Sequence, residues 1–137
     1  MTTDKTNGNA RPCVLVVEDD DAVRRSLQLL LRGRGLDVRA HASARAALAD
    51  PNSRAAVCLV ADLLMPEVDG VALLEALRHD GWVGPAILIS GFLTPERILA
   101  AEQAGFTTVL RKPLVETSIA EAVNRAIAGG DGQRAPS

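Results

Sequence analysis

Apolar residues follow two alternating patterns along this chain. Five short runs of aliphatic residues predict β-strands, and they lie at residues 13–17, 36–41, 57–61, 86–90 and 107–110. Each run precedes a longer segment whose apolar residues recur every three or four positions, which predicts a helix. Strict alternation of strands and helices predicts an α/β fold: an open, doubly wound parallel sheet of five strands with five helices.

Capping residues mark the ends of several predicted helices. The second helix should begin after Ser43, and the third at about Gly70. The fourth has Thr94 as a predicted N-cap, followed by Pro95, and should end at Gly105. Local signals therefore agree with the periodicity.

The two ends of the chain lack these patterns. Residues 1–11 and 129–137 are polar or glycine-rich and show no apolar periodicity, so we expect disordered tails there. Residues 12–128 should form one domain. A chain of 137 residues, of which 47% are hydrophobic, has room for one substantial core.

Charge and cysteine content narrow the possible environments. A net charge of -2 gives no general attraction to nucleic acid or to an anionic membrane surface. No apolar run is long enough to span a membrane and the first residues are polar, so we expect a cytoplasmic protein. Cys13 and Cys58 lie in apolar runs without the spacing of a zinc site, which favours reduced core thiols.

Polar residues lie at or just beyond the ends of four of the predicted strands. They are Glu18 and Asp19 at the first, Asp62 at the third, Ser90 at the fourth and Lys112 at the fifth. In a doubly wound sheet the carboxyl ends of the strands meet at one edge. Clustered carboxylates repel one another, and oxygen ligands without histidine or cysteine favour Mg²⁺. With a lysine and a hydroxyl beside it, such a carboxylate suits phosphoryl transfer.

Each of these residues alone has a simpler interpretation. Acidic residues after a strand also cap helices, and for Asp20 and Asp21 both interpretations stay open. Asp62 alone could cap a turn, Ser90 could bond the backbone, and Lys112 could be a solvated charge. Their joint placement at successive strand ends favours a site.

Three segments resemble the receiver domain of bacterial two-component response regulators, the CheY-like superfamily. They are VVEDDDAVR (16–24), DLLMPEVDG (62–70) and LRKP (110–113). The resemblance covers residues 12–128. It implies a flavodoxin-like sheet in the order 2-1-3-4-5 and a cis peptide bond between Lys112 and Pro113.

The resemblance also implies roles for the residues at the strand ends. Asp62 would be the phosphoacceptor, Lys112 would contact the phosphoryl oxygens, and Ser90 would be the switch hydroxyl. The groups implied to hold Mg²⁺ are Asp19 directly, Glu18 through water, Asp62, and the backbone carbonyl of Leu64.

The implied function is that of a signalling switch. The receiver would take a phosphoryl group from a histidine kinase or a histidine phosphotransfer protein. It would catalyse its own phosphorylation and slow dephosphorylation without otherwise being an enzyme. Phosphorylation would change contacts of the fourth helix, fifth strand and fifth helix with a downstream protein or a second copy, without direct contact to nucleic acid.

Two alternatives accompany this interpretation. The chain could be the receiver part of a longer DNA-binding transcription regulator. A phosphatase of haloacid-dehalogenase type also uses an aspartate at a strand end, but it normally has a second aspartate two residues later, where this chain has Leu64.

The chain departs from the family pattern at three positions. Val109 stands three residues before the lysine, where the family usually has an aromatic residue that takes part in switching. Leu64 and Phe92 stand where family members help to place the water that hydrolyses the acyl phosphate. Neither side chain can hydrogen-bond a water, so we expect a long-lived phosphorylated state. Phe106 and Trp82 should pack in or against the core.

Overall fold

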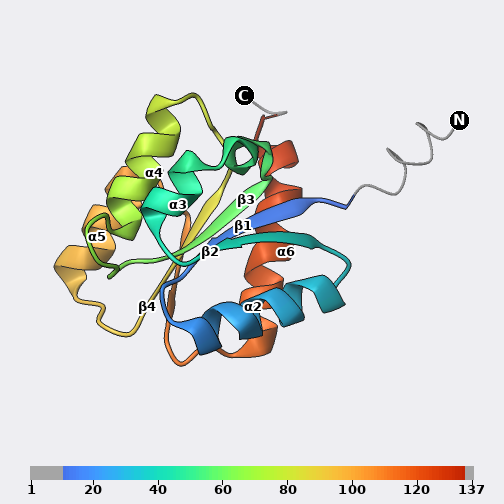
Figure 1. Ribbon diagram of the computed structural model, residues 1–137, viewed down its shortest axis with the longest axis horizontal. Coiled ribbons are helices and arrows are strands. Elements are labelled where there is room, and N and C mark those ends of the chain that lie inside the picture. Colours follow the sequence, from blue (N-terminus) through green and yellow to red (C-terminus); the bar gives the residue numbers. More distant parts are fainter. Residues whose placement is uncertain (1–10, 135–137) are drawn as a thin grey trace, which may run out of the picture.

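One sheet of five parallel strands lies at the centre of the computed structural model, which describes residues 11–134 (Figure 1). The strands are β1 (Cys13–Val17), β2 (Asp37–His41), β3 (Cys58–Asp62), β4 (Ala86–Ser90) and β5 (Thr108–Arg111). Their order is β2-β1-β3-β4-β5, which confirms the predicted fold class. Each strand begins and ends within one residue of its predicted limits.

Within residues 11–134, five α-helices and one short 3₁₀ helix lie between the strands or after the last one. They are α2 (Asp21–Gly33), α3 (Ala44–Ala49), η1 (Pro51–Ala55), α4 (Gly70–His79), α5 (Pro95–Ala104) and α6 (Glu116–Arg134). The predicted caps are confirmed: Ser43 accepts a hydrogen bond from the backbone N–H of Ala46, and Thr94 accepts one from that of Arg97. Gly105 ends α5 with a φ of 117°, in the left-handed region that favours glycine.

The C-terminal helix differs from the prediction. We expected ordered structure to end at residue 128, but α6 continues to Arg134. Glycine and polar residues made this segment resemble a tail, yet it holds no proline before Pro136, so its backbone can continue the helical hydrogen bonds. The rest of the predicted tails, residues 1–10 and 135–137, lies outside the described residues.

Both faces of the sheet are covered by helices. Along β1, Val14 and Val16 pack with residues of α2 and α6, whereas Leu15 and Val17 pack with residues of α3, α4 and α5. Figure 1 shows the two groups of helices on opposite sides of the sheet. Burial on both faces explains why β1, β3 and β4 are almost continuously apolar.

The cysteines and two of the aromatic residues have structural roles. Both cysteines are free, and burial raises the pKa of the Cys58 thiol to about 12, so this thiol stays protonated and unreactive. Phe106 is buried in the core, and buried Trp82 donates its indole N–H to the carbonyl of Ala56 at 2.9 Å. In the described part of the chain, no helix combines the length and apolarity needed to cross a membrane.

Gly70, at the start of α4, lies unusually close to the phosphoacceptor candidate. A Cβ atom at this position would lie 2.5 Å from the backbone carbonyl oxygen of Asp62 and 3.1 Å from Leu88 Cδ1. The φ of Gly70 is not positive, so no left-handed turn requires glycine there. Glycine is required because the helix starts against the end of β3.

We therefore expect Gly70→Ala to destabilise the fold by about 1–3 kcal/mol, because the added methyl group would displace the end of β3. Gly33→Ala is the matched control: nothing lies within 4 Å of a Cβ at this helical position, so it should be neutral or stabilising by up to about 1 kcal/mol. Urea unfolding followed by the fluorescence of Trp82 measures both. Equal stability of Gly70→Ala and the native protein would contradict this account.

Candidate functional site

The carboxyl ends of four strands bring the predicted site residues together. Glu18 follows β1, Asp62 ends β3, Ser90 ends β4, and Lys112 follows β5. In the register of the sheet, Asp62 lies opposite Ile89, and Ser90 lies opposite Arg111. Asp62 is only 5% exposed, so its environment is set mainly by protein groups.

Lys112 lies between two of the carboxylates. Its Nζ is 2.8 Å from Glu18 Oε1 and 3.3 Å from Asp62 Oδ2. Partial burial by itself lowers the pKa of Lys112, but the hydrogen bond with Glu18 and the charges of Glu18 and Asp62 outweigh it and raise the pKa. The lysine therefore stays charged at neutral pH and joins the ends of three strands. The Lys112–Pro113 peptide bond is cis, as the resemblance implied.

Glu18 is the most buried acidic residue of the cluster. Burial raises its pKa to about 7, and the charge of Asp62 acts in the same direction, while Lys112 and the backbone N–H of Asp20 oppose the shift. Its Oε2 accepts a hydrogen bond from that N–H at 3.0 Å. Its Oε1 lies 2.8 Å from Lys112 Nζ in the ion pair. Burial of this carboxylate beside the charge of Asp62 favours positive charge at this edge of the sheet.

Three carboxylates are close enough to share a metal ion. Glu18, Asp19 and Asp62 each offer one oxygen, and these oxygens all lie within 4.8 Å of one another. Asp19 is exposed, and its carboxylate has no hydrogen-bond or ion-pair partner among residues 11–134. An all-oxygen donor set of this kind fits a hard cation such as Mg²⁺. A ligand role for the Leu64 carbonyl stays a prediction.

The other two residues of the acidic run have helical roles. Asp20 is the N-cap of α2 and accepts hydrogen bonds from the backbone N–H groups of Ala22 and Val23. Asp21 forms an ion pair with Arg24. The capping interpretation is therefore the correct one for Asp20, and Asp21 lies in the first turn, where negative charge is favourable.

The hydroxyl of Ser90 is linked to the next helix through the backbone of Phe92. Ser90 is fully buried, and its Oγ accepts a hydrogen bond from the N–H of Phe92 at 3.1 Å. The carbonyl of Phe92 in turn accepts a hydrogen bond from Arg97 Nη1 of α5 at 2.6 Å. A displacement of the Ser90 hydroxyl would therefore change the hydrogen bonds of a loop that is attached to α5.

The departures from the family pattern lie around this site. Val109, which stands where the family usually has an aromatic residue, is half-buried and packs against the core. Leu64 is 40% exposed in the loop after β3, and Phe92 is 68% exposed in the loop after β4. The two loops at the carboxyl edge thus present apolar side chains to solvent.

Sequence reasoning missed two features near the site. One is Arg24, which donates a hydrogen bond from Nη1 to the backbone carbonyl of Glu18 at 2.8 Å. Its spacing of three residues from Asp21 is compatible with an ion pair within a helix, but no pattern in the sequence points to the contact with the carbonyl of Glu18. The other is a groove of about 310 Å³ between α2 and the loop after β5. Its lining residues include Val23, Leu27, Leu30, Lys112, Pro113 and Leu114.

The fold and this arrangement at the strand ends define a receiver domain. The family model described as "Response regulator receiver domain" matches residues 14–124. This chain therefore belongs to the receiver domain family of response regulators, which are components of two-component systems, and the phosphatase alternative is set aside.

Similar proteins agree with this assignment. Transcriptional regulatory protein FixJ of Rhizobium meliloti (strain 1021) is 40% identical over 114 residues, which cover 82% of this chain and 55% of FixJ. Transcriptional regulatory protein TdiR of Thauera aromatica is 37% identical over 128 residues, 93% of this chain and 56% of TdiR. The crystal structure of FixJ-N superposes with a TM-score of 0.76 at 38% identity and covers 85% of this chain and 94% of that one. This chain spans about half the length of these curated relatives.

Proposed function

We propose that this receiver accepts a phosphoryl group on Asp62 from the phosphohistidine of a histidine kinase or a histidine phosphotransfer protein. The observation that carries the proposal is the placement of Asp62. It is buried at a strand end, 3.3 Å from the Lys112 ammonium and in a cluster with Glu18 and Asp19.

The proposed reaction is a transfer between two nucleophiles. An Asp62 carboxylate oxygen forms the new bond to phosphorus while the bond from phosphorus to the histidine nitrogen breaks, and the imidazole keeps that electron pair. In this proposal, Lys112 and the Ser90 hydroxyl meet the charge on the phosphoryl oxygens. Mg²⁺, held by Asp19, Glu18, Asp62 and the Leu64 carbonyl, would supply further positive charge there. The receiver is then both substrate and catalyst.

The groove beside the site offers a docking surface for the phosphodonor. It joins an apolar strip of α2, including Val23 and Leu30, to Lys112 and Pro113. A helix of the kinase or phosphotransfer protein lying in this groove would bring its phosphohistidine to the edge that holds Asp62. Helix-in-groove recognition requires this kind of apolar channel.

The first prediction concerns the phosphoacceptor. With Mg²⁺ and a small phosphodonor, intact-mass analysis should show one added phosphoryl group on the native protein and none on Asp62→Asn. Asp20→Asn is the matched control, because asparagine also caps helices and the native residue only caps α2. Phosphorylation of Asp62→Asn, or its loss in Asp20→Asn, would contradict the assignment.

We propose that the output runs through the face formed by α5, β5 and α6. Helix α5 has one buried residue, Ala101, and leaves Leu99 54% exposed. The hydrogen bonds from Ser90 through Phe92 to Arg97 connect the site to this helix. Phosphorylation would thereby alter binding to a downstream protein or to a second copy.

The second prediction tests this face with beryllofluoride, which mimics the phosphoryl group. Sedimentation velocity should show self-association, or amide exchange should change over residues 91–115, only when beryllofluoride and Mg²⁺ are present. Leu99→Ser should weaken that association, whereas Val83→Ser, which also replaces an exposed apolar residue by serine but lies before β4, should not. Identical sedimentation and exchange with and without beryllofluoride would rule out the proposed output.

A second candidate output follows from the relatives. FixJ and TdiR are transcriptional regulatory proteins, and the regions that match this chain make up 55% and 56% of their lengths. The alternative proposal is that this receiver controls a DNA-binding part of a longer regulator. The complete reading frame of the gene distinguishes this from a receiver that acts alone.

The third prediction concerns the lifetime of the phosphorylated state. Leu64 and Phe92 cannot orient an attacking water, so Leu64→Asn and Phe92→Glu should each speed decay of the phosphorylated protein in Mg²⁺ buffer by roughly tenfold or more. Val115→Asn is the control, since this exposed apolar residue is the last of the loop after β5, directly before α6, and its substitution should leave the rate unchanged. If the native protein loses its phosphoryl group within seconds, or if the polar variants decay no faster, the two apolar residues do not protect it.

A further inference from the structure

Among the described residues, three of the four acidic residues after β1 have partners and Asp19 has none. Glu18 contacts Lys112, Asp20 caps α2, and Asp21 pairs with Arg24. No hydrogen bond or ion pair holds the Asp19 carboxylate within the described residues. The backbone on either side of Asp19 therefore sets where this side chain leaves the chain and which rotamers it can adopt.

Two hydrogen bonds anchor the peptide groups that flank Asp19. The carbonyl of the peptide before it, that of Glu18, accepts from Arg24 Nη1 at 2.8 Å. The N–H of the peptide after it, that of Asp20, donates to Glu18 Oε2 at 3.0 Å. The N–H of Glu18 also donates to the carbonyl of His41 in β2 at 3.1 Å. Asp19 thus lies between two fixed peptide planes.

Arg24 makes this anchor without occupying a carboxylate of the metal cluster. Its Nη2 bonds Asp21 in the same turn of α2, and its side chain is only 21% exposed. The planar guanidinium joins the first turn of α2 to the end of β1 with two donors. All the oxygens of Asp19 stay available for an ion.

We propose that Arg24 is a positioning residue of the Mg²⁺ site, which aims the Asp19 carboxylate at the ion by fixing the Glu18–Asp19 peptide. The proposal rests on the proposed function, since it presumes that Asp19 is a ligand. Partners that orient a metal ligand typically change metal affinity by about tenfold or more when they are removed.

Charge and positioning predict opposite results for the loss of this arginine. Removing a positive charge near the site would, by electrostatics alone, tighten binding of a divalent cation. Removing the anchor would weaken binding, because Asp19 would have to be ordered when the ion binds. The sign of the change therefore distinguishes the two effects.

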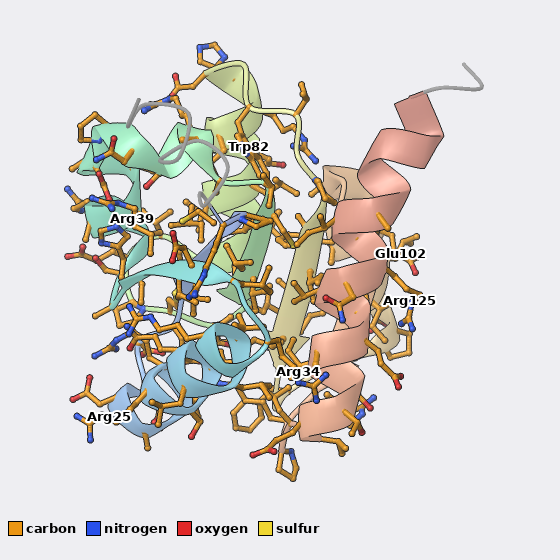
Figure 2. The ribbon with its side chains drawn as sticks, turned by 90° about the vertical axis from the view of Figure 1, so that its right-hand side faces the viewer. Arg25, Arg34, Arg39, Trp82, Glu102 and Arg125 are labelled. Carbon is orange, nitrogen blue, oxygen red and sulfur yellow. The ribbon has the colours of Figure 1, made fainter. Side chains whose placement is uncertain are left out.

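The test is a calorimetric titration of the unphosphorylated protein with Mg²⁺ alone. Arg24→Ala should bind Mg²⁺ about tenfold more weakly than the native protein. Arg25→Ala is the matched control: it removes the same charge from the next position, whose side chain points away from α2 into solvent (Figure 2) and makes no ion pair among the described residues. It should bind as tightly as the native protein or slightly more tightly.

Two further measurements separate the possible failures. Asp19→Asn should lose most of its Mg²⁺ affinity, and if it binds normally the proposed metal site itself is wrong. If Asp19→Asn fails to bind but Arg24→Ala binds as tightly as Arg25→Ala, only the role of Arg24 is wrong. Urea midpoints without metal show whether each variant folds. If Arg24→Ala does not fold, the Mg²⁺ affinity of Arg24→Lys is measured instead. Weaker binding despite the retained charge supports the positioning role of Arg24, and native affinity overturns that role.

Discussion

The candidate site depends on the Lys112 ammonium between the carboxylates of Glu18 and Asp62, at 2.8 and 3.3 Å. Two carboxylates this close would repel strongly, and removing one partner of a buried pair is costly. Lys112 follows β5, so its side chain must cross the end of β4 to reach β3 and β1, and neighbouring strands are about 4.8 Å apart. A long side chain meets this requirement. The strand order therefore requires a side chain as long as that of lysine at residue 112. Ser90, at the end of β4, lies between Lys112 and the end of β3.

The same constraint explains how a chain can place four acidic residues directly after a buried strand. Each neighbour along the run uses a different kind of partner: an ammonium for Glu18, helix N–H groups for Asp20 and a guanidinium for Asp21. Within the described structure, only the Asp19 carboxylate of this run has no protein partner. The negative charge that remains is concentrated at one exposed oxygen pair beside two buried carboxylates, which is a suitable arrangement for a hydrated divalent cation.

Much of this arrangement could be predicted from the sequence, because it follows from periodicity and chain order. The apolar runs predicted the limits of each strand to within one residue. A parallel sheet then implies that the residues at the strand ends lie together at one edge. Three features could not be predicted, because they depend on contacts between distant segments: the pairing of Lys112 with Glu18, the contact of Arg24 with a backbone carbonyl, and the approach of Gly70 to Asp62. The 3₁₀ helix η1 was missed as well, because a proline such as Pro51 can mark the end of one helix and can also occupy the first position of the next.

Substitution of the usual aromatic residue by Val109 leaves the backbone as the proposed path from the site to α5. A hydrogen bond contributes about 1 kcal/mol net to stability. On phosphorylation, the Ser90 hydroxyl would exchange its bond with the Phe92 N–H for one to a phosphoryl oxygen. Such an exchange shifts the loop between two conformations only if they are close in free energy. Helix α5 is suited to such a balance, because it buries only Ala101 and is attached to the loop by Arg97. A small change in hydrogen bonding can therefore move a helix that little apolar burial holds in place, without a side chain that turns inward through the core.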